Sequence, residues 1–383
     1  MDQFRAIVRD LSHKGLGVIN HPDGRVFFCR GTWPGDEGIF EIPSGALKYS
    51  EAKLTELITP SSGRVHSPCH HRGSLPGECG GCPWMIASYE EQLRFKTKRL
   101  IHALEKRKVF LSEEILRPII PSEKIFAYRN RVQVKSDGKR LGYVSEGTKT
   151  LAPIEECLVM NPGLRQTFEE VKSLLPREDL SPGENHPWFY MDLDDEMTLS
   201  ELVPNKRRPF RQGNSIQNEK MRSWLKTKLS EFPNHYPAVD LYSGSGNFTE
   251  ILSEEGFENI LAVEVQGVAL ESLRRKNLSG VRIMEEDLSS KGAWARVAKL
   301  QPHAKIVVAD PAREGILKRR NFIKSFDNLE TLIYVSCELD SFARDAGDFI
   351  RAGFKLIELT PLDLFPHTSH VEILSVFQRL SKS

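Results

Sequence analysis

The chain has 383 residues, of which 39% are hydrophobic and 27% charged, and its formal net charge is +1. This length exceeds one ordinary hydrophobic core, so we expect two or three domains of a soluble globular protein. No apolar run approaches the ~18 residues of a membrane span, and the start MDQFRAIVRD is too polar for a signal peptide. We therefore expect a cytoplasmic monomer with no membrane partner.

The charge is unevenly distributed along the chain. Between Arg94 and Lys149 there are 15 Lys and Arg against 6 Asp and Glu, and a second basic cluster, NKRRPFR, occupies residues 205–211. Clustered cations of this kind can form a phosphate-binding surface for nucleic acid. Either cluster taken alone is equally consistent with a solvated surface.

Residues 1 to about 60 contain short runs of β-formers that are broken by turns. The runs FRAIVRDL, KGLGVINHPDGRVFFCR and WPGDEGIFEIP, with a hairpin turn at Asp23-Gly24, predict a small antiparallel barrel. Further along, the spacing of Leu93, Leu100 and Leu104 predicts a helix from Ser88 to about Lys108. Residues 120–205 mix turns with short predicted strands, namely RVQVK, RLGYVS and PWFYMDL.

An irregular piece rich in Pro, Ser and His precedes the predicted helix and carries three of the six cysteines. A C-x2-C pair on a Gly-Gly turn is typical of metal sites, and in a cytosolic chain this spacing favours a metal over disulfides. On the residues alone, zinc is the first choice, with His70 and His71 as spare ligands. The candidate ligands are Cys69, Cys79, Cys82 and Cys157.

From about Asn214 the pattern changes to alternating strands and helices. Four short apolar runs separated by helical stretches predict a parallel, doubly wound sheet. The last apolar run, VEILSVFQRL, lies close to the C-terminus, and we expect it to be an edge strand. The four runs are AVDLY (238–242), NILAVE (259–264), KIVVAD (305–310) and TLIYVS (331–336).

The segment AVDLYSGSGNFTEIL combines a strand, a Gly-rich turn and the start of a helix. Gly244 and Gly246 allow a ligand to approach the backbone, and Asp240 lies at the carboxyl edge of the sheet, where ligands of such folds bind. Because Thr249 takes the third glycine position of the dinucleotide fingerprint, a nucleoside without phosphates is the better interpretation.

The next predicted strand ends at Glu264, the usual place for an acid that binds ribose hydroxyls, and Asp287 follows at the distance expected for an adenine contact. With Tyr242 in the same turn, these residues resemble the S-adenosylmethionine site of class I methyltransferases. A dinucleotide enzyme and a plain tight turn with surface acids remain the alternatives.

Three residues at the predicted sheet edge suit methylation of a pyrimidine. Carbon 5 of the ring is a poor nucleophile, but a thiolate that adds to C6 creates an enolate that accepts a methyl group. A carboxylate then removes the C5 proton. Cys337 supplies the thiol, Glu372 the carboxylate, and Asp310 is the candidate partner of the uracil imide. The alternative for Cys337 is a small buried hydrophobe.

Taken together, these residues make the chain resemble the RNA uracil-5-methyltransferases. More narrowly, it resembles the rRNA members with an N-terminal TRAM domain and an iron–sulfur cluster. Ala312, Ser243 and the segment 338–340 depart from the family pattern. The stretches that carry the resemblance are FRQGN (210–214), DLYSGSGNFT (240–249), DPAREG (310–315), SC with ARD around Cys337, and PHTSHVE (366–372).

The resemblance implies an α/β class I, Rossmann-like methyltransferase domain, an N-terminal OB-like barrel and a small α+β iron–sulfur domain. The TRAM barrel would occupy residues 1–60. The central iron–sulfur and RNA-binding domain would occupy residues 61–87 and 120–205, and the methyltransferase domain residues 88–119 and 206–383.

The implied function is S-adenosyl-L-methionine-dependent C5-methylation of a uridine in 23S rRNA, with Cys337 as nucleophile, Glu372 as base and Asp310 as a further catalytic residue. The four cysteines would hold a [4Fe–4S] cluster, with zinc as the alternative. A tRNA methyltransferase and a non-catalytic iron–sulfur RNA-binding protein remain alternative functions. The implied cofactor contacts are Gln212, Asp240, Tyr242, Gly244, Glu264, Asp287 and Asp310, and the substrate contacts are Phe210, Gln212 and Asp310.

Overall fold

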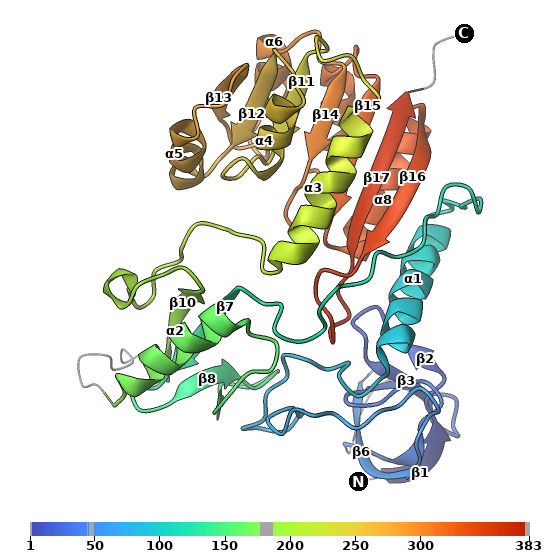
Figure 1. Ribbon diagram of the computed structural model, residues 1–383. Helices are drawn as coiled ribbons and strands as arrows, with labels where there is room; N and C mark the ends of the chain where they lie inside the picture. Colours follow the sequence, from blue (N-terminus) through green and yellow to red (C-terminus); the bar gives the residue numbers. More distant parts are fainter. Residues whose placement is uncertain (1, 44, 46–49, 177–186, 380–383) are drawn as a thin grey trace. The chain divides into compact units, whose positions relative to one another are not determined.

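A computed structural model describes residues 2–43, 45, 50–176 and 187–379 (Figure 1). Each of the three predicted domains contains some residues that the structure does not describe. The chain forms two compact units. Unit 1 comprises Met1–Lys96, Lys124–Arg208 and Phe365–Ser369, and unit 2 comprises Thr97–Glu123, Pro209–Leu364 and His370–Ser383. The division into three domains stays a prediction. No helix in the described ranges is both long and apolar enough to span a membrane.

The first part of unit 1 is a six-stranded sheet with the order β1-β5-β6-β4-β3-β2. Its pairs are antiparallel, as predicted, except that β4 pairs with β6 in parallel. Phe4, Ile19, Phe27 and Phe40 form the centre of its core, a layout compatible with an OB-like domain. The strands are β1 (Asp2–Ile7), β2 (Asp10–Leu11), β3 (Gly17–Asn20), β4 (Val26–Cys29), β5 (Glu37–Ile42) and β6 (Glu51–Thr59).

The second part of unit 1 is a four-stranded sheet with the order β10-β7-β8-β9, and helix α2 packs on it. The predicted strands of this region are confirmed, whereas β9 and α2 were not predicted. Asn161 caps α2 by accepting a hydrogen bond from the Leu164 N–H, and Pro162 takes the first helical position. The elements are β7 (Arg131–Ser136), β8 (Leu141–Val144), β9 (Leu151–Pro153), α2 (Pro162–Ser173), β10 (Phe189–Asp194) and η2 (Leu199–Glu201).

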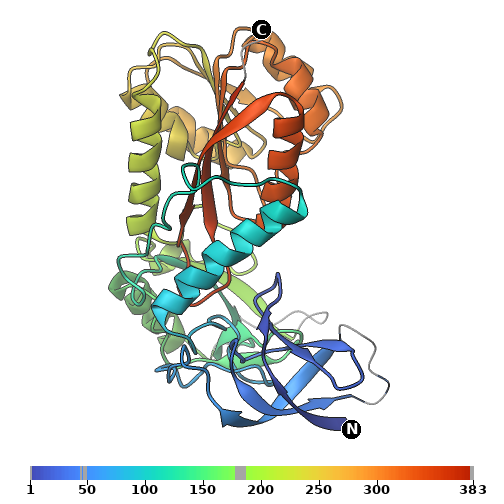
Figure 2. The same cartoon turned by 90° about the vertical axis from the view of Figure 1, so that its right-hand side faces the viewer.

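Unit 2 is built on a seven-stranded sheet with the order β13-β12-β11-β14-β15-β17-β16, and helices cover both faces (Figures 1 and 2). The four predicted parallel strands are confirmed. Most of their residues are apolar because both faces of the sheet are buried. The strands are β11 (Ala238–Leu241), β12 (Ile260–Glu264), β13 (Val281–Glu285), β14 (Ile306–Ala309), β15 (Thr331–Ser336), β16 (Phe354–Leu362) and β17 (Glu372–Arg379).

The prediction that the last strand lies at the sheet edge is wrong. Strand β17 pairs antiparallel with both β15 and β16, so β16 forms the edge. β16 was missed because Lys355, Glu358 and Thr360 interrupt its apolar pattern, and its Pro361 suits an edge position. The last residue of the predicted run, Leu380, lies outside the described residues.

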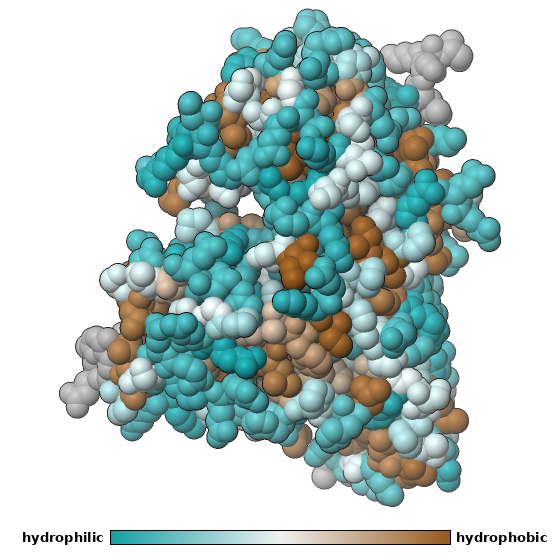
Figure 3. All heavy atoms as spheres, in the orientation of Figure 1, coloured by the Kyte–Doolittle hydropathy of each residue, from teal (hydrophilic) through white to brown (hydrophobic). Residues whose placement is uncertain are grey.

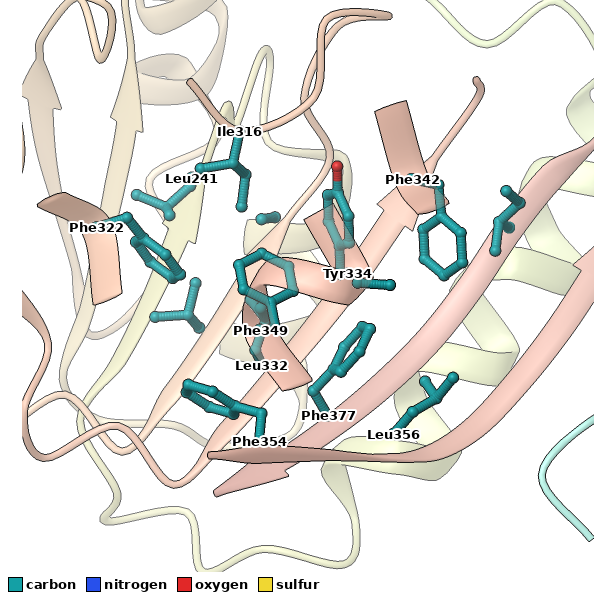
Figure 4. Packing of buried hydrophobic residues seen from close by; sticks show 14 of the residues in the cluster. Leu241, Ile316, Phe322, Leu332, Tyr334, Phe342, Phe349, Phe354, Leu356 and Phe377 are labelled. Atoms are coloured by element: carbon teal, nitrogen blue, oxygen red, sulfur yellow. The ribbon is translucent and has the colours of Figure 1, made fainter. Parts of the chain in front are cut away.

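The helices of unit 2 bury apolar stripes against the sheet. Tyr334 of β15 and Phe349 of α8 meet edge to face with ring centroids 5.8 Å apart, inside an aromatic core (Figure 4). Hydrophilic side chains cover most of the surface over α4, α5 and α6 (Figure 3). The helices are α3 (Ser215–Leu229), α4 (Asn247–Glu254), α5 (Gly267–Arg275), α6 (Ala293–Leu300), α7 (Arg319–Ser325) and α8 (Leu339–Arg351), with the end of α1 (Tyr89–Lys106).

Candidate active site

Four of the predicted site residues lie at the carboxyl edge of the parallel strands. The carboxyl ends of parallel strands meet at one edge of a sheet, where ligands of open α/β folds bind. Asp240 and Glu264 lie within the last two residues of β11 and β12, and Asp310 and Cys337 directly follow β14 and β15. The sheet order places β11 and β14 side by side, with β15 next to β14.

Glu372 reaches the same edge because β17 runs in the opposite direction. As its first residue, Glu372 lies at the edge where the parallel strands end, and the pair Ser336–Ile373 fixes the register with β15. Cys337 and Glu372 therefore occupy adjacent positions on neighbouring strands. The side chain of Glu372 is only 4% exposed, whereas Cys337 is half-buried.

The Gly-rich turn after β11 leaves open space over its backbone. Gly244 adopts a φ of +54°, which favours glycine, and no atom lies within 4 Å of the position that a Cβ would take. Glu264 fixes the turn, since its Oε2 accepts a hydrogen bond of 3.0 Å from the Gly244 N–H. The hydroxyl of Ser243 is buried without a hydrogen-bond partner in the described structure. An open turn beside an unsatisfied hydroxyl fits a polar ligand.

Asp240 lies beneath this turn and is 1% exposed. Its Oδ2 accepts a hydrogen bond of 2.5 Å from the Thr249 hydroxyl in α4, which ties the strand to the helix. Burial raises the pKa of Asp240 to about 7, and the nearby charges of Asp310 and Glu264 add to that effect. The ligand-free protein therefore keeps a proton on a carboxyl group that is ionised when the chain unfolds.

This raised pKa predicts a loss of stability with rising pH. Between pH 3.8 and about 7 the folded state holds a proton on Asp240 that the unfolded state has released, so stability falls through this window. The loss reaches about 4 kcal/mol at pH 8. In urea unfolding of the ligand-free protein, Asp240→Asn should lose less stability than wild type between pH 5 and 8. The exposed Asp287→Asn should behave as wild type, and equal losses in all three proteins would contradict this assignment.

The thiol of Cys337 lies among ionisable side chains. Burial is the main cause that raises its pKa to about 12; Glu372 and Asp310 contribute to this rise, and Arg313 opposes it. Burial also raises the pKa of Asp310 to about 7 and that of Glu372 well above its ordinary value. Without a bound cation at this edge, Cys337 therefore holds its proton at neutral pH.

The reactivity of Cys337 should follow these charges. At pH 9 Asp310 is ionised and opposes formation of the thiolate, so Asp310→Asn should lower the pKa of Cys337 and speed its alkylation by iodoacetamide about tenfold. Arg313→Gln removes the favourable cation and should slow the same reaction. The rate is read by mass spectrometry of the peptide that contains Cys337. A slower reaction in Asp310→Asn would refute the charge arrangement.

Asp345, in the ARD stretch of α8, organises the loop that follows Asp310. It is fully buried, and its Oδ2 accepts hydrogen bonds from the Ile316 N–H at 2.9 Å and the Tyr334 hydroxyl at 2.8 Å. In Figure 4 that hydroxyl points out of the aromatic core. Arg344 and Arg319 pair with the same carboxylate. The sequence analysis names the ARD stretch but assigns no role to Asp345. The burial of this residue and its pairing with Arg319 appear only in the folded structure.

The remaining predicted contacts differ in exposure. Asp287 is exposed, and Phe210 is 70% exposed on the segment that leads into α3. Gln212 lies on the same segment, two residues before Asn214. Asn214 caps α3 and donates to the Leu364 carbonyl at 3.1 Å, which explains the asparagine of the FRQGN stretch. Tyr242 has a φ of +60° and packs against the core of unit 2.

The four predicted ligand cysteines gather in unit 1. All are reduced and line one cavity together with His71 and Tyr143. Burial and the neighbouring thiols raise the pKa values of Cys79 and Cys82. In the described ranges, no group of three or more His, Cys, Asp and Glu side chains is arranged to hold a metal ion. The four cysteines are Cys69, Cys79, Cys82 and Cys157.

His71 and His367 both have structural contacts within unit 1. The Nε2 atom of His71 accepts a hydrogen bond from the Glu155 N–H at 3.0 Å. His367 is buried, its backbone N–H donates to Gln92, and its carbonyl accepts from the Trp84 N–H. These contacts explain why histidines occur beside the predicted cysteine and glutamate sites.

Comparison with solved structures identifies the fold of unit 2. The chain superposes on a tRNA (uracil-54, C5)-methyltransferase of Pyrococcus abyssi with a TM-score of 0.71 and 24% identity, over 97% of this chain and 99% of that one. That structure was solved in complex with S-adenosyl-L-homocysteine. The predicted Rossmann-like methyltransferase fold is thus confirmed.

Sequence comparison identifies the family. The model of the tRNA (uracil-5-)-methyltransferase family matches residues 204–379. The chain is 42% identical to an uncharacterized RNA methyltransferase of Nitrosomonas europaea, over 98% of this chain and 97% of that protein. It is 27% identical to a Francisella tularensis 23S rRNA (uracil(1939)-C(5))-methyltransferase, RlmD, with the same coverage of both chains. The chain belongs to the RNA (uracil-5-)-methyltransferase family and is an enzyme of that class.

Proposed function

We propose that this enzyme transfers a methyl group from S-adenosyl-L-methionine to carbon 5 of a uridine in 23S rRNA, through a covalent adduct between Cys337 and carbon 6. The observation that carries the proposal is the pairing of a half-buried thiol and a buried carboxyl group at adjacent positions of β15 and β17. Addition of the thiol at C6 and removal of the proton from C5 act on neighbouring atoms of the uracil ring, so the two protein groups must lie close together.

The open turn at Gly244 and the unpartnered hydroxyl of Ser243 support a nucleoside cofactor at the edge of β11 and β12. S-adenosyl-L-methionine supplies an electrophilic methyl group on a positively charged sulfur. Glu264 and Asp287 would hold its ribose and adenine, with Asp240, Tyr242 and Gly244 shaping the turn. The family agrees with this cofactor, as does the S-adenosyl-L-homocysteine bound in the Pyrococcus abyssi structure.

Two groups of the protein take part directly in the bond changes at the ring. The thiol of Cys337 releases its proton to solvent and its sulfur bonds to C6, while Asp310 and Gln212 hold the uracil imide and Phe210 stacks on a base. After C5 has received the methyl group, the carboxylate of Glu372 takes the C5 proton and the bond between sulfur and C6 breaks. Burial raises the pKa of Glu372, so this carboxyl group must be ionised, as a bound positive charge would favour, before it can take the C5 proton.

The covalent step is tested with RNA that carries 5-fluorouridine at the target. Fluorine cannot leave as a cation, so wild-type enzyme should form a stable protein–RNA adduct, seen as a shifted band on a denaturing gel. Glu372→Gln should accumulate an adduct with ordinary RNA, because loss of a general base costs ~10²–10⁴-fold in rate. Cys337→Ala should give no adduct and no methylation while still binding cofactor. Methylation by Cys337→Ala within about tenfold of wild type would end the proposal.

The same trap distinguishes the two candidate substrates. The RlmD relatives match over nearly their whole length and their names specify 23S rRNA, whereas the family model and the Pyrococcus abyssi structure are named for tRNA. We favour rRNA because the RlmD relative shares 27% identity with this chain, whereas the Pyrococcus abyssi structure, at 24% identity, supports the fold alone. Fluorinated 23S rRNA fragments should form the adduct and fluorinated tRNA should not; the reverse result would assign a tRNA substrate.

The cysteine cavity is proposed to hold a [4Fe–4S] cluster on Cys69, Cys79, Cys82 and Cys157. A single zinc ion needs four ligands within ~2.3 Å of one centre, an arrangement that the described side chains do not form. A four-iron cluster binds one thiolate at each iron and so accommodates ligands that are farther apart. Bound there, the cluster would supply structural support, because methyl transfer needs no electron.

Metal content decides this assignment. Protein purified without oxygen should be brown and contain about four irons per chain. Cys157→Ser should lower the metal content and the unfolding temperature, because the loss of a ligand weakens both the site and the fold around it. Cys29→Ser is the matched control, since Cys29 is buried in the separate core of the first sheet. One zinc per chain and no visible absorption would overturn the iron–sulfur assignment.

A further inference from the structure

A second charged feature of unit 2 lies outside the candidate active site. Lys106, at the end of α1, and the next two residues, Arg107 and Lys108, line an open cavity of about 230 Å³ with Arg344 and Arg351 of α8. All five of these side chains are cationic. Gly347 forms the remaining wall, so the cavity lining contains no acidic residue.

The cations on the α1 side of the cavity have no acidic partners among the described residues. Within the described part of the chain, no ion pair or side-chain hydrogen bond involves Lys106, Arg107 or Lys108, and all three are exposed. On the α8 side, Arg344 pairs with Asp345 and Arg351 pairs with Asp348. Arg319 pairs with both of these acids. The acids nearby are therefore already matched, and the positive charge of the first three residues is uncompensated.

Helix stability alone does not explain this cluster. A cation in the last turn of a helix stabilises it by about 0.3–1 kcal/mol through the helix dipole, and Lys106 serves that purpose for α1. Arg107 and Lys108 lie beyond the helix. Gly347 interrupts α8 at a cost of roughly 0.5–1 kcal/mol relative to alanine, and a Cβ there would lie 3.3 Å from the Arg351 guanidinium. The glycine gives Arg351 the room to line the cavity.

We propose that this cavity, which we call the α1–α8 basic cavity, binds consecutive phosphodiesters of the RNA substrate close to the target nucleotide. The inference rests on the proposed function, because it requires that RNA enter at the edge marked by Cys337. Arg344 lies five residues into α8, which begins two residues after Cys337, so its Cα is about 7.5 Å along the helix axis from that edge. Guanidinium and ammonium groups are the usual partners of RNA phosphates.

The test replaces the three unpaired cations together, as Lys106→Gln/Arg107→Gln/Lys108→Gln. If each contacts a phosphate of single-stranded RNA, the slope of log affinity against log salt should fall by about 2, and the affinity loss between 50 and 200 mM salt should shrink about tenfold. Binding is measured with a 23S rRNA fragment that the wild-type enzyme methylates. The variant should bind S-adenosyl-L-methionine as wild type does.

The chain offers a closely matched control in Arg274→Gln/Arg275→Gln/Lys276→Gln. These three consecutive cations also end a helix, α5, but Arg275 pairs with Glu271 and Lys276 with Glu250. The control loses the same charge and should keep the wild-type salt slope to within about half a unit. Equal changes of the salt slope in both variants would mean that the effect comes from net charge alone, which would overturn the inference. A wild-type salt slope in the variant of residues 106–108 would overturn it as well.

Failure of this inference is distinguishable from failure of the proposed function. At saturating RNA, the variant of the α1–α8 basic cavity should still form the 5-fluorouridine adduct, because Cys337 and Glu372 are unchanged. If the wild type forms the adduct and the variant binds RNA normally, only the phosphate site is wrong. If the wild type forms no adduct on any RNA, the function proposed for Cys337 is wrong whatever the salt slopes show.

Discussion

The architecture of the candidate site depends on one antiparallel strand. β17 inserts between β15 and β16, and its reversed direction brings Glu372 to the edge where the parallel strands end. Had the chain continued in parallel, the start of its last strand, and Glu372 with it, would lie at the opposite edge from Cys337. The placement of a thiol beside a carboxyl group is therefore a consequence of sheet topology. Strand β16 pairs with the other side of β17, so β17 is not an exposed edge.

Gathering acids at one buried edge has an energetic consequence. Asp240, Asp310 and Glu372 all have raised pKa values because burial removes water from their carboxyl groups, and close spacing adds repulsion in two of the three. Such a site destabilises the ligand-free fold, and a positively charged cofactor would relieve it. Burial also raises the pKa of Asp345, but Arg319 and Arg344 act against that rise. Its carboxyl group pairs with both arginines and fastens the loop after Asp310 to α8.

Two groups of basic residues that look alike in the sequence have different surroundings. Arg208, in the NKRRPFR cluster, pairs with Asp194 and its backbone N–H donates to Asp192, so it holds β10 in place. Lys106, Arg107 and Lys108 have no such partners in the described part of the chain and face two arginines of α8. The distinction between a structural cation and a candidate phosphate ligand rests on which acids the fold brings close, a property that local sequence does not contain.

The sequence by itself determined four of the parallel strands, but not β13, together with the helix after residue 88 and the Gly-rich turn, because apolar periodicity and glycine chemistry are local. It also supplied the candidates Cys337, Glu372 and Asp310. Only the tertiary structure decided that β17 is interior, that β16 exists behind a broken apolar pattern, and that Asp345 is a buried hub. It also decided which cations gather around one cavity. These features depend on pairing between segments far apart in the chain, where burial and register override local preference.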